Sequence, residues 1–111
     1  MENKWFVRTA DTKAVEQVPG VTRRTMSYNE EIMMCQFELQ TGAEIALHAH
    51  AAIQNGYVLS GRMQFFKQDG SSVIVEEGDS YVFDSNEPHG VTCLEHAFVV
   101  ENFLPTRKEF M

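Results

Sequence analysis

Three histidines and one glutamine stand in this sequence at positions where they could hold a metal ion together. His48 and His50 are one residue apart in the stretch of residues 42–61, GAEIALHAHAAIQNGYVLSG, and Gln54 follows shortly after them. If this stretch is extended, residues i and i+2 point to the same face, so both imidazoles project together. Gln54 can offer its amide oxygen to the same ion, and His89 supplies a third imidazole from further along the chain.

This set of donors points to one divalent metal ion. Neutral imidazoles and an amide oxygen suit Zn²⁺, Ni²⁺, Fe²⁺ or Mn²⁺. At the mouth of a barrel such a site leaves a position for water or substrate, which is typical of catalytic centres. Because Gln54 is uncharged, the ion keeps its full charge, which favours polarising a carbonyl or hydroxyl over activating oxygen. The alternative is a metal-free barrel whose histidines only fill the pocket.

A carboxylate in an apolar strand is the second chemical feature. In residues 97–103, AFVVENF, an extended chain places Val99, Glu101 and Phe103 on one face. An unpaired glutamate facing the core is costly. Glu101 therefore points either to solvent or into a pocket where a carboxylate is needed.

The elements that must position these residues are strands. Short apolar segments separated by turn residues predict an all-β barrel or sandwich, and we expect no helix of ordinary length. Ser60 and Gly61 predict the turn of a β-hairpin, and the tail after Pro105 is short and charged. The strands that we expect are residues 21–28, 31–39, the histidine stretch, 57–59, 62–67, 73–75, 81–83 and 97–103.

Length and composition predict one domain over residues 1–111, with an N-terminal arm at 1–19 and a short C-terminal tail at 104–111. The net charge of −7 disfavours a nucleic acid or an anionic membrane as partner. Nothing resembles a signal peptide, and no apolar run approaches the roughly 18 residues of a membrane span. We therefore expect a cytoplasmic protein in which Cys35 and Cys93 are reduced thiols.

An apolar pair near the N-terminus, Trp5 and Phe6, bears on assembly. It predicts a short edge strand that either pairs with another subunit or caps its own barrel. We expect a homodimer whose interface includes this arm or the face of a barrel sheet, because two such side chains are too apolar to stay exposed beside a small barrel.

The histidine stretch and the segment around His89 resemble the two motifs of the cupin superfamily. The first motif is G-x5-H-x-H-x3,4-E-x6-G. This sequence matches it except at position 54, where it has Gln54 in place of the glutamate. The second motif has a glycine, a proline and a histidine. The resemblance implies a single-domain cupin, a double-stranded β-helix or jelly-roll barrel. The matching residues are Gly42, His48, His50, position 54 and Gly61 in the first motif, and Gly78, Pro88 and His89 in the second.

Within the cupins the chain resembles the small proteins of the KdgF type, which act on 4,5-unsaturated monouronates released from pectin and alginate. That family holds its metal with His, His, Gln and His, so Gln54 fits it better than the general pattern. The family has an aspartate at the position of Glu101, so this side chain is one methylene longer. The shared features are Gly20-Val21-x-Arg23, the HAH…Q ligand set, Tyr57-Val58-x-x-Gly61, and the ending Glu101-x-Phe103-x-Pro105-x-Arg107-x-x-Phe110.

The resemblance implies that a cyclic 4,5-unsaturated monouronate is converted to its open-chain keto form. Glu101 would be the general acid/base, Phe103 would form a wall of the pocket, and Arg107 would pair with the carboxylate of the acidic sugar. Arg23 and Arg62 are further candidates for that pairing, although a surface charge is the better interpretation of Arg62. A non-catalytic cupin that binds a sugar or a small acid is the alternative, and a metal-dependent dioxygenase is disfavoured by Gln54. We expect His96 to be a solvated turn residue.

Overall fold

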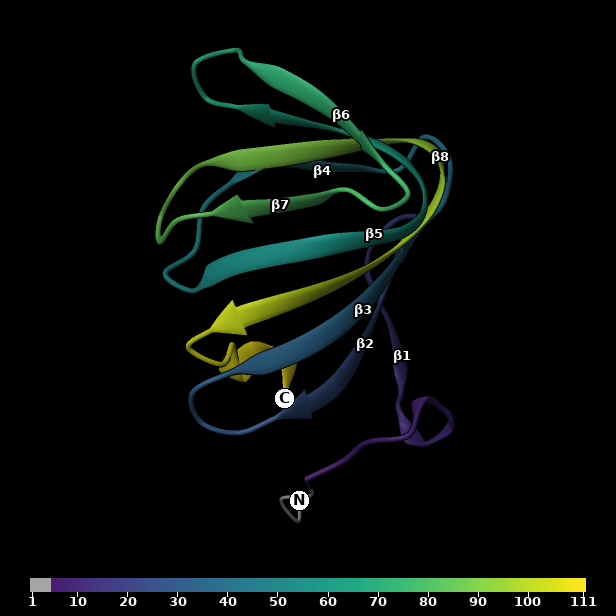
Figure 1. The fold of residues 1–111 in the computed structure, drawn as a ribbon, viewed down its shortest axis with the longest axis vertical. Coiled ribbons are helices and arrows are strands. Elements are labelled where there is room, and N and C mark those ends of the chain that lie inside the picture. Colours follow the sequence, from purple (N-terminus) through teal and green to yellow (C-terminus); the bar gives the residue numbers. More distant parts are fainter. Residues whose placement is uncertain (1–4) are drawn as a thin grey trace.

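Two long antiparallel strands, β5 (Ile53–Lys67) and β8 (His89–Leu104), run through the middle of the molecule and join its two walls (Figure 1). The computed structural model describes residues 5–111. The first half of β5 pairs with the second half of β8, and the second half of β5 with the first half of β8. Each strand therefore contributes to both walls of one barrel.

The shorter strands complete the two walls. β3 flanks the second half of β8 and β7 flanks the first half of β5, while β4 and β6 flank the other halves. The sheet order is β1-β2-β3-β8-β5-β6, with β4 on β8 and β7 on β5. The predicted all-β class is confirmed. The remaining strands are β1 (Ala14–Val18), β2 (Val21–Tyr28), β3 (Met33–Leu39), β4 (Glu44–His48), β6 (Ser72–Glu76) and β7 (Ser80–Phe83), and 3₁₀ turns lie at Thr9–Asp11 and Lys108–Phe110.

The predicted hairpin at Ser60 and Gly61 is wrong. Both flanking segments belong to β5, which continues through the glycine with irregular register against β8. Gly61 has a φ of 89°, and a Cβ atom there would lie 2.2 Å from the carbonyl oxygen of His96. The glycine allows a bulge in a continuous strand that passes from one wall to the other.

Two other predicted boundaries also change. The last strand begins at His89 rather than at Ala97, so it carries a predicted ligand at one end and Glu101 near the other. The histidine strand β4 ends at His48, and His50 lies in the loop before β5. The shared strand face predicted for the two histidines therefore does not exist, although their rings still come together.

The interior of the barrel follows the alternation of the strands. On β3, for example, Met33, Cys35, Phe37 and Leu39 are buried and the residues between them are not. Cys35 and Cys93 are both buried, and neither forms a disulfide. On β8 the buried residues include two polar ones, His89 and Glu101, among apolar neighbours.

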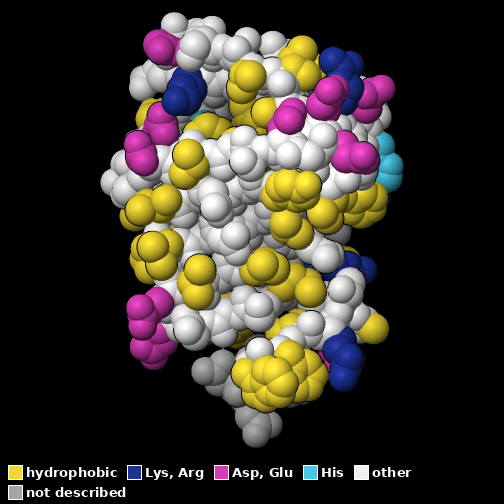
Figure 2. All heavy atoms as spheres, viewed as in Figure 1, with side chains coloured by type: hydrophobic (Ala, Val, Ile, Leu, Met, Phe, Trp, Pro, Cys, Tyr) yellow, Lys and Arg dark blue, Asp and Glu magenta, His cyan; other side chains and the backbone are white. Residues whose placement is uncertain are grey.

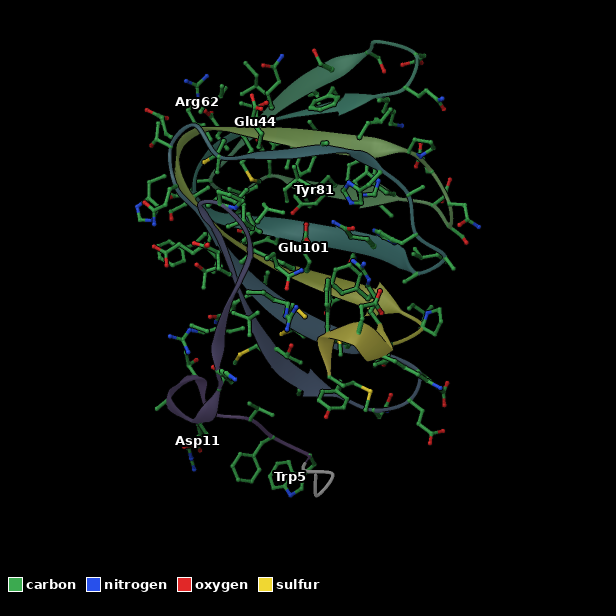
Figure 3. The ribbon with its side chains drawn as sticks, turned by 180° about the vertical axis from the view of Figure 1, so that it is seen from behind. Trp5, Asp11, Glu44, Arg62, Tyr81 and Glu101 are labelled. Atoms are coloured by element: carbon green, nitrogen blue, oxygen red, sulfur yellow. The ribbon has the colours of Figure 1, made fainter. Side chains whose placement is uncertain are left out.

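The N-terminal arm does not cap the barrel. Its strand, β1, pairs with β2, but Trp5 and Phe6 lie before it, packed edge to face and 91% and 43% exposed. Figure 3 shows Trp5 away from the barrel wall. The predicted strand at this pair is therefore wrong, and the capping alternative is wrong as well. The first four residues of the predicted arm lie outside the described residues.

The C-terminal tail folds back onto the barrel. It ends in the 3₁₀ turn, and Phe110 within this turn is buried against Phe37 and Phe103. The hydroxyl of Thr25 donates a hydrogen bond to the carbonyl oxygen of Phe110 at 2.6 Å. The tail thus closes one end of the interior. No helix among residues 5–111 is long and apolar enough to cross a membrane.

Candidate metal centre

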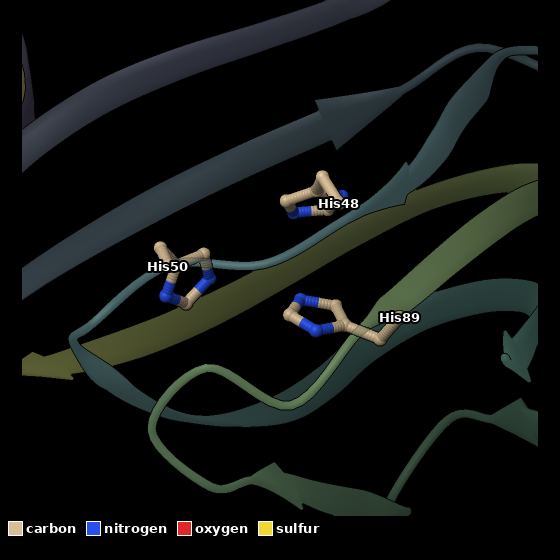
Figure 4. A group of neighbouring side chains, drawn as sticks. All are labelled: His48, His50 and His89. Carbon is tan, nitrogen blue, oxygen red and sulfur yellow. The ribbon is translucent and has the colours of Figure 1, made fainter.

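His48, His50 and His89 meet inside the barrel (Figure 4). His48 and His89 are partners across β4 and β8, with ring centroids 4.4 Å apart. One ligand nitrogen from each of the three rings lies within 4.8 Å of the others. This spacing is compact enough for the three nitrogens to contact a common ion.

All three imidazoles are oriented by the backbone. A carbonyl oxygen only accepts hydrogen bonds, so each Nδ1 must carry the proton and each Nε2 of a neutral ring offers a lone pair. This is the usual way in which protein groups prepare histidine for a metal. The bonds run from His48 Nδ1 to Ala46 O at 2.8 Å, from His50 Nδ1 to Ala52 O at 2.7 Å, and from His89 Nδ1 to Glu87 O at 2.8 Å.

The Nε2 atom of His89 is buried and has no hydrogen-bond partner among the described residues. Its ring is stacked on Phe83 at 4.0 Å. Burial lowers the pKa of His89 to about 4, and burial together with nearby Arg107 also lowers the pKa of His50. Both rings are therefore neutral at pH 7 and present lone pairs. A buried lone pair without a partner is the feature that a metal ion would satisfy.

Gln54 connects this group to Glu101. It is buried on β5, its Nε2 donates to Glu101 Oε2 at 2.7 Å, and its Oε1 lies 2.9 Å from His50 Nε2. Since His50 carries its proton on Nδ1, two lone pairs face each other across this gap. Turning the amide over would instead place its oxygen 2.7 Å from the carboxylate. A cation that contacts both Gln54 and His50 resolves the conflict, so these residues fit a divalent ion.

Glu101 points into the barrel and is only 8% exposed. Its Oε2 accepts hydrogen bonds from Gln54 and from the hydroxyl of Tyr81, the latter at 2.5 Å. Burial raises the pKa of Glu101 to about 7, against the lowering effect of these two bonds. The expected solvent-facing alternative for this residue is therefore wrong.

A cavity of about 180 Å³ opens beside this group. Its lining combines several polar side chains with apolar side chains from both walls. That arrangement is typical of a small-molecule site. Six of the predicted site residues line this cavity: His48, Gln54, His89, Glu101, Phe103 and Arg107.

Arg107 reaches the cavity from the C-terminal tail. Its guanidinium lies 4.1 Å from the ring centroid of Phe110 and 5.1 Å from that of Phe103. The Nε atom is buried and has no hydrogen-bond partner within residues 5–111, while the outer nitrogen contacts Glu109 at 3.3 Å. One cationic group with unused donors therefore borders the cavity.

The other candidate cations and the fourth histidine lie elsewhere. Arg23 packs on Phe110 at 4.3 Å and donates to Gln17, so it supports the tail and does not line the cavity. Arg62 contacts two surface glutamates, Glu76 and Glu95. His96 is exposed, lies 2.7 Å from Glu38 and is outside the site as expected, but the predicted turn is wrong because His96 lies within β8.

Sequence reasoning missed Tyr81 and Phe110 as parts of the site. From the sequence alone, Tyr81 looks like an ordinary aromatic residue of a strand. The feature that could have indicated its role is Gly56, a glycine inside a strand. Such a glycine often marks a place where another group approaches closely. Phe110 lies in a tail that reads as charged and exposed.

Comparisons with known proteins agree with this geometry. Residues 35–101, more than half of the chain, match the family described as the cupin domain. The chain belongs to the cupin family. This cupin is 31% identical over 94 residues to the pectin degradation protein KdgF of Dickeya dadantii strain 3937. The match covers 83% of this chain and 84% of that protein. The predicted relationship to KdgF-type cupins is confirmed.

Solved cupin structures superpose on most of the chain. An RmlC-like cupin from Shewanella frigidimarina NCIMB 400 has a TM-score of 0.90 and 27% identity, with 97% of this chain and 96% of that chain covered. KdgF from Halomonas sp. has a TM-score of 0.89 and 24% identity, with 97% and 99% covered. At that identity the second match shows the fold alone. The predicted cupin barrel is confirmed.

Proposed function

We propose that this cupin is a metal-dependent enzyme that converts a cyclic 4,5-unsaturated monouronate to its open-chain keto form. The observation that carries the proposal is Gln54, which contacts both a histidine of the candidate metal site and the buried carboxylate of Glu101. A group that binds an ion and a group that moves protons are thereby fixed beside the same cavity. The similarity to the pectin degradation protein KdgF supports a sugar acid as substrate.

The residues that would hold the ion are His48, His50, Gln54 and His89. A bound divalent ion would supply Lewis acidity toward a substrate oxygen. The protein would contribute orientation, because the backbone hydrogen bonds of the histidines fix which nitrogen faces the ion. Whether the ion is zinc, nickel, iron or manganese depends on availability as well as on this donor set.

Glu101 would act as the general acid/base. In the proposed reaction the C1 hydroxyl loses a proton, the bond between C1 and the ring oxygen breaks, and C4 gains a proton as C5 becomes a ketone. The atoms balance, since the product is an isomer of the substrate. One carboxyl group that lies over the ring can accept the first proton and deliver the second.

Arg107 and Phe103 would bind the substrate. The Nε–H of Arg107 has no partner among the described residues, and the guanidinium borders the cavity, where it can pair with the uronate carboxylate. Phe103 is buried next to His50, with ring centroids 5.9 Å apart, and forms an apolar wall. Phe110 supports Arg107 from the tail. These contacts would hold the acidic sugar with its reacting carbons near Glu101.

The substitution Arg107→Gln tests this binding role. We expect KM to rise by about 10–100-fold, the loss associated with a charge-assisted hydrogen bond, while kcat changes little. Steady-state kinetics on an unsaturated monouronate would measure both constants. Arg62→Gln is the matched control, because Arg62 contacts only surface glutamates, and it should behave like the parent. Equal KM values for the two variants would contradict the assignment of Arg107.

Turnover itself tests the proposed function. The carbon–carbon double bond conjugated with the carboxylate absorbs in the ultraviolet, and the keto product does not. The metal-loaded protein should remove this absorbance well above the spontaneous rate. A non-catalytic binding cupin would bind the sugar and leave the rate unchanged, and a dioxygenase would consume oxygen; either result would overturn the proposal.

We also propose that the chain forms a homodimer through the outer face of β5 and β8. Tyr57, Leu59, Phe98 and Leu104 are each 40–48% exposed there, and Figure 2 shows hydrophobic side chains over the same side of the molecule. The outward residues from Ile53 to Leu59 and from Phe98 to Leu104 include no charged side chain. For a chain of net charge −7, an uncharged face lets a second copy approach without like-charge repulsion.

Light scattering at micromolar concentration should therefore give twice the chain mass of 12.7 kDa. Leu59→Glu should shift the protein to the monomer, because it buries a charge in the interface. Ile74→Glu, at a residue that is 47% exposed on β6, is the control and should leave the dimer intact. A monomer mass for the parent protein would rule the dimer out.

A further inference from the structure

Tyr81, Gly56 and Glu101 lie in one row across three neighbouring strands. Gly56 on β5 is the direct partner of Tyr81 on β7 and of Glu101 on β8. Residues paired in this way point to the same face of the sheet, here the interior. The labelled side chains of Tyr81 and Glu101 lie on the inner side in Figure 3.

Gly56 makes room for the ring of Tyr81 to cross the row. A Cβ atom at Gly56 would lie 2.3 Å from Cζ of Tyr81 and 2.4 Å from its hydroxyl oxygen, far closer than side-chain atoms approach. The φ of Gly56 is not positive, so this close approach, rather than an unusual backbone angle, explains the glycine. With any larger residue at position 56 the tyrosine could not reach the carboxylate.

The hydroxyl of Tyr81 determines which oxygen of Glu101 remains available. Tyr81 and Gln54 both donate to Oε2. The other oxygen, Oε1, accepts no hydrogen bond from residues 5–111 that the structure records, and Glu101 borders the cavity. The tyrosine ring is itself held by Phe65, with centroids 4.4 Å apart, so its hydroxyl is a fixed donor.

We propose that Tyr81 is a positioning residue that, through the space left by Gly56, fixes the Glu101 carboxyl group so that Oε1 exchanges protons with the substrate. The inference rests on the proposed function of this cavity. A purely structural role would need only the aromatic ring, because an apolar core gains nothing from a hydroxyl. The hydroxyl of Tyr81 is needed only to hold the Glu101 carboxyl group with Oε1 toward the substrate.

Tyr81→Phe removes the hydroxyl and keeps the ring. We expect kcat to fall by about 10–100-fold, the loss of one hydrogen bond to a charged group, with KM and bound metal unchanged. Tyr57→Phe is the matched control for loss of a hydroxyl, because Tyr57 does not line the cavity and the variant keeps the ring that the proposed dimer would bury, and it should retain the activity of the parent. An active parent with an equally fast Tyr81→Phe variant would overturn the inference and leave the proposed function intact.

A double-mutant cycle with Glu101→Gln separates positioning from packing. If Tyr81 acts through Glu101, Tyr81→Phe should slow the parent but have little further effect once Glu101 is glutamine. If it only packs, both backgrounds should slow equally, which would contradict the proposal.

A second measurement does not require turnover. In the parent, the bonded hydroxyl proton of Tyr81 should exchange slowly and give its own downfield proton resonance, absent from Tyr81→Phe and from Glu101→Ala but present in Tyr57→Phe. Absence of this resonance in the parent would overturn the inference. Its presence in a parent that does not open the uronate ring would refute the proposed function alone.

Discussion

We expect Glu101→Gln to lower turnover of the unsaturated monouronate by about 10²–10⁴-fold, the usual contribution of a general acid/base. The amide has nearly the same size as the carboxyl group, and its oxygen can still accept from Gln54 and Tyr81. Proton transfer is therefore the property that is lost. The absorbance assay would measure the rate, and elemental analysis would show that the variant keeps its metal.

Glu38→Gln is a suitable control for this substitution. Glu38 lies on β3 and contacts His96 outside the barrel, so its replacement should not change turnover. If Glu101→Gln were as fast as the parent at the same metal content, Glu101 would not carry the proton. The proposed mechanism would then be wrong in its main residue.

The second large effect concerns His89→Ala. His89 is nearly fully buried, and its Nε2, a proposed ligand atom, has no hydrogen-bond partner in the part of the chain that the structure describes. Because loss of supporting contacts alone weakens metal binding by about 10–100-fold, loss of a ligand should weaken it by roughly 100-fold or more. A calorimetric titration with the metal ion would measure the dissociation constant. Turnover should fall in parallel.

His96→Ala is the matched histidine control and should bind metal as the parent does, since His96 is exposed and outside the group. The double variant His48→Ala, His50→Ala should hold no stoichiometric metal. One ion per chain in this variant would contradict the assignment of these histidines as metal ligands. The metal-free parent should remain folded because the barrel has an extensive apolar core of its own. Unfolding on metal removal would instead indicate a structural ion.

The grouping of His48, His50 and His89 could be predicted from sequence because it depends on residue type and spacing. The stated reason was partly wrong, since His50 lies beyond the end of β4 and no common strand face unites it with His48. The loop and the backbone hydrogen bond of His50 bring its ring to the site instead. The spacing of the histidines in the sequence thus predicted that their rings come together, whereas the strand geometry inferred from that spacing was wrong.

The long strands could not be predicted because the decisive contacts are distant. Ser60 and Gly61 have the composition of a hairpin turn, but pairing of both halves of β5 with β8 keeps the strand continuous. The same register places Tyr81 opposite Gly56 and Glu101. Nothing within a few residues of Tyr81 contains that information, which is why its contact with Glu101 appears only in the folded chain.

The structure also accounts for glutamine at position 54. An amide can offer its oxygen toward His50 and donate its N–H to Glu101 at the same time. A glutamate there would place two carboxyl groups in contact and require a shared proton. The sequence showed the departure from the general cupin motif, but its physical cause is the neighbouring carboxylate.

The most direct test of the central claim is turnover during titration of the metal-free protein with a divalent ion. We predict that the rate of ring opening starts at the spontaneous value, rises in proportion to added metal, and stops rising at one ion per chain. Full activity in the metal-free protein, or no activity at one bound ion per chain with any of the four metals, would contradict the assignment of this cavity as a metal-dependent active site.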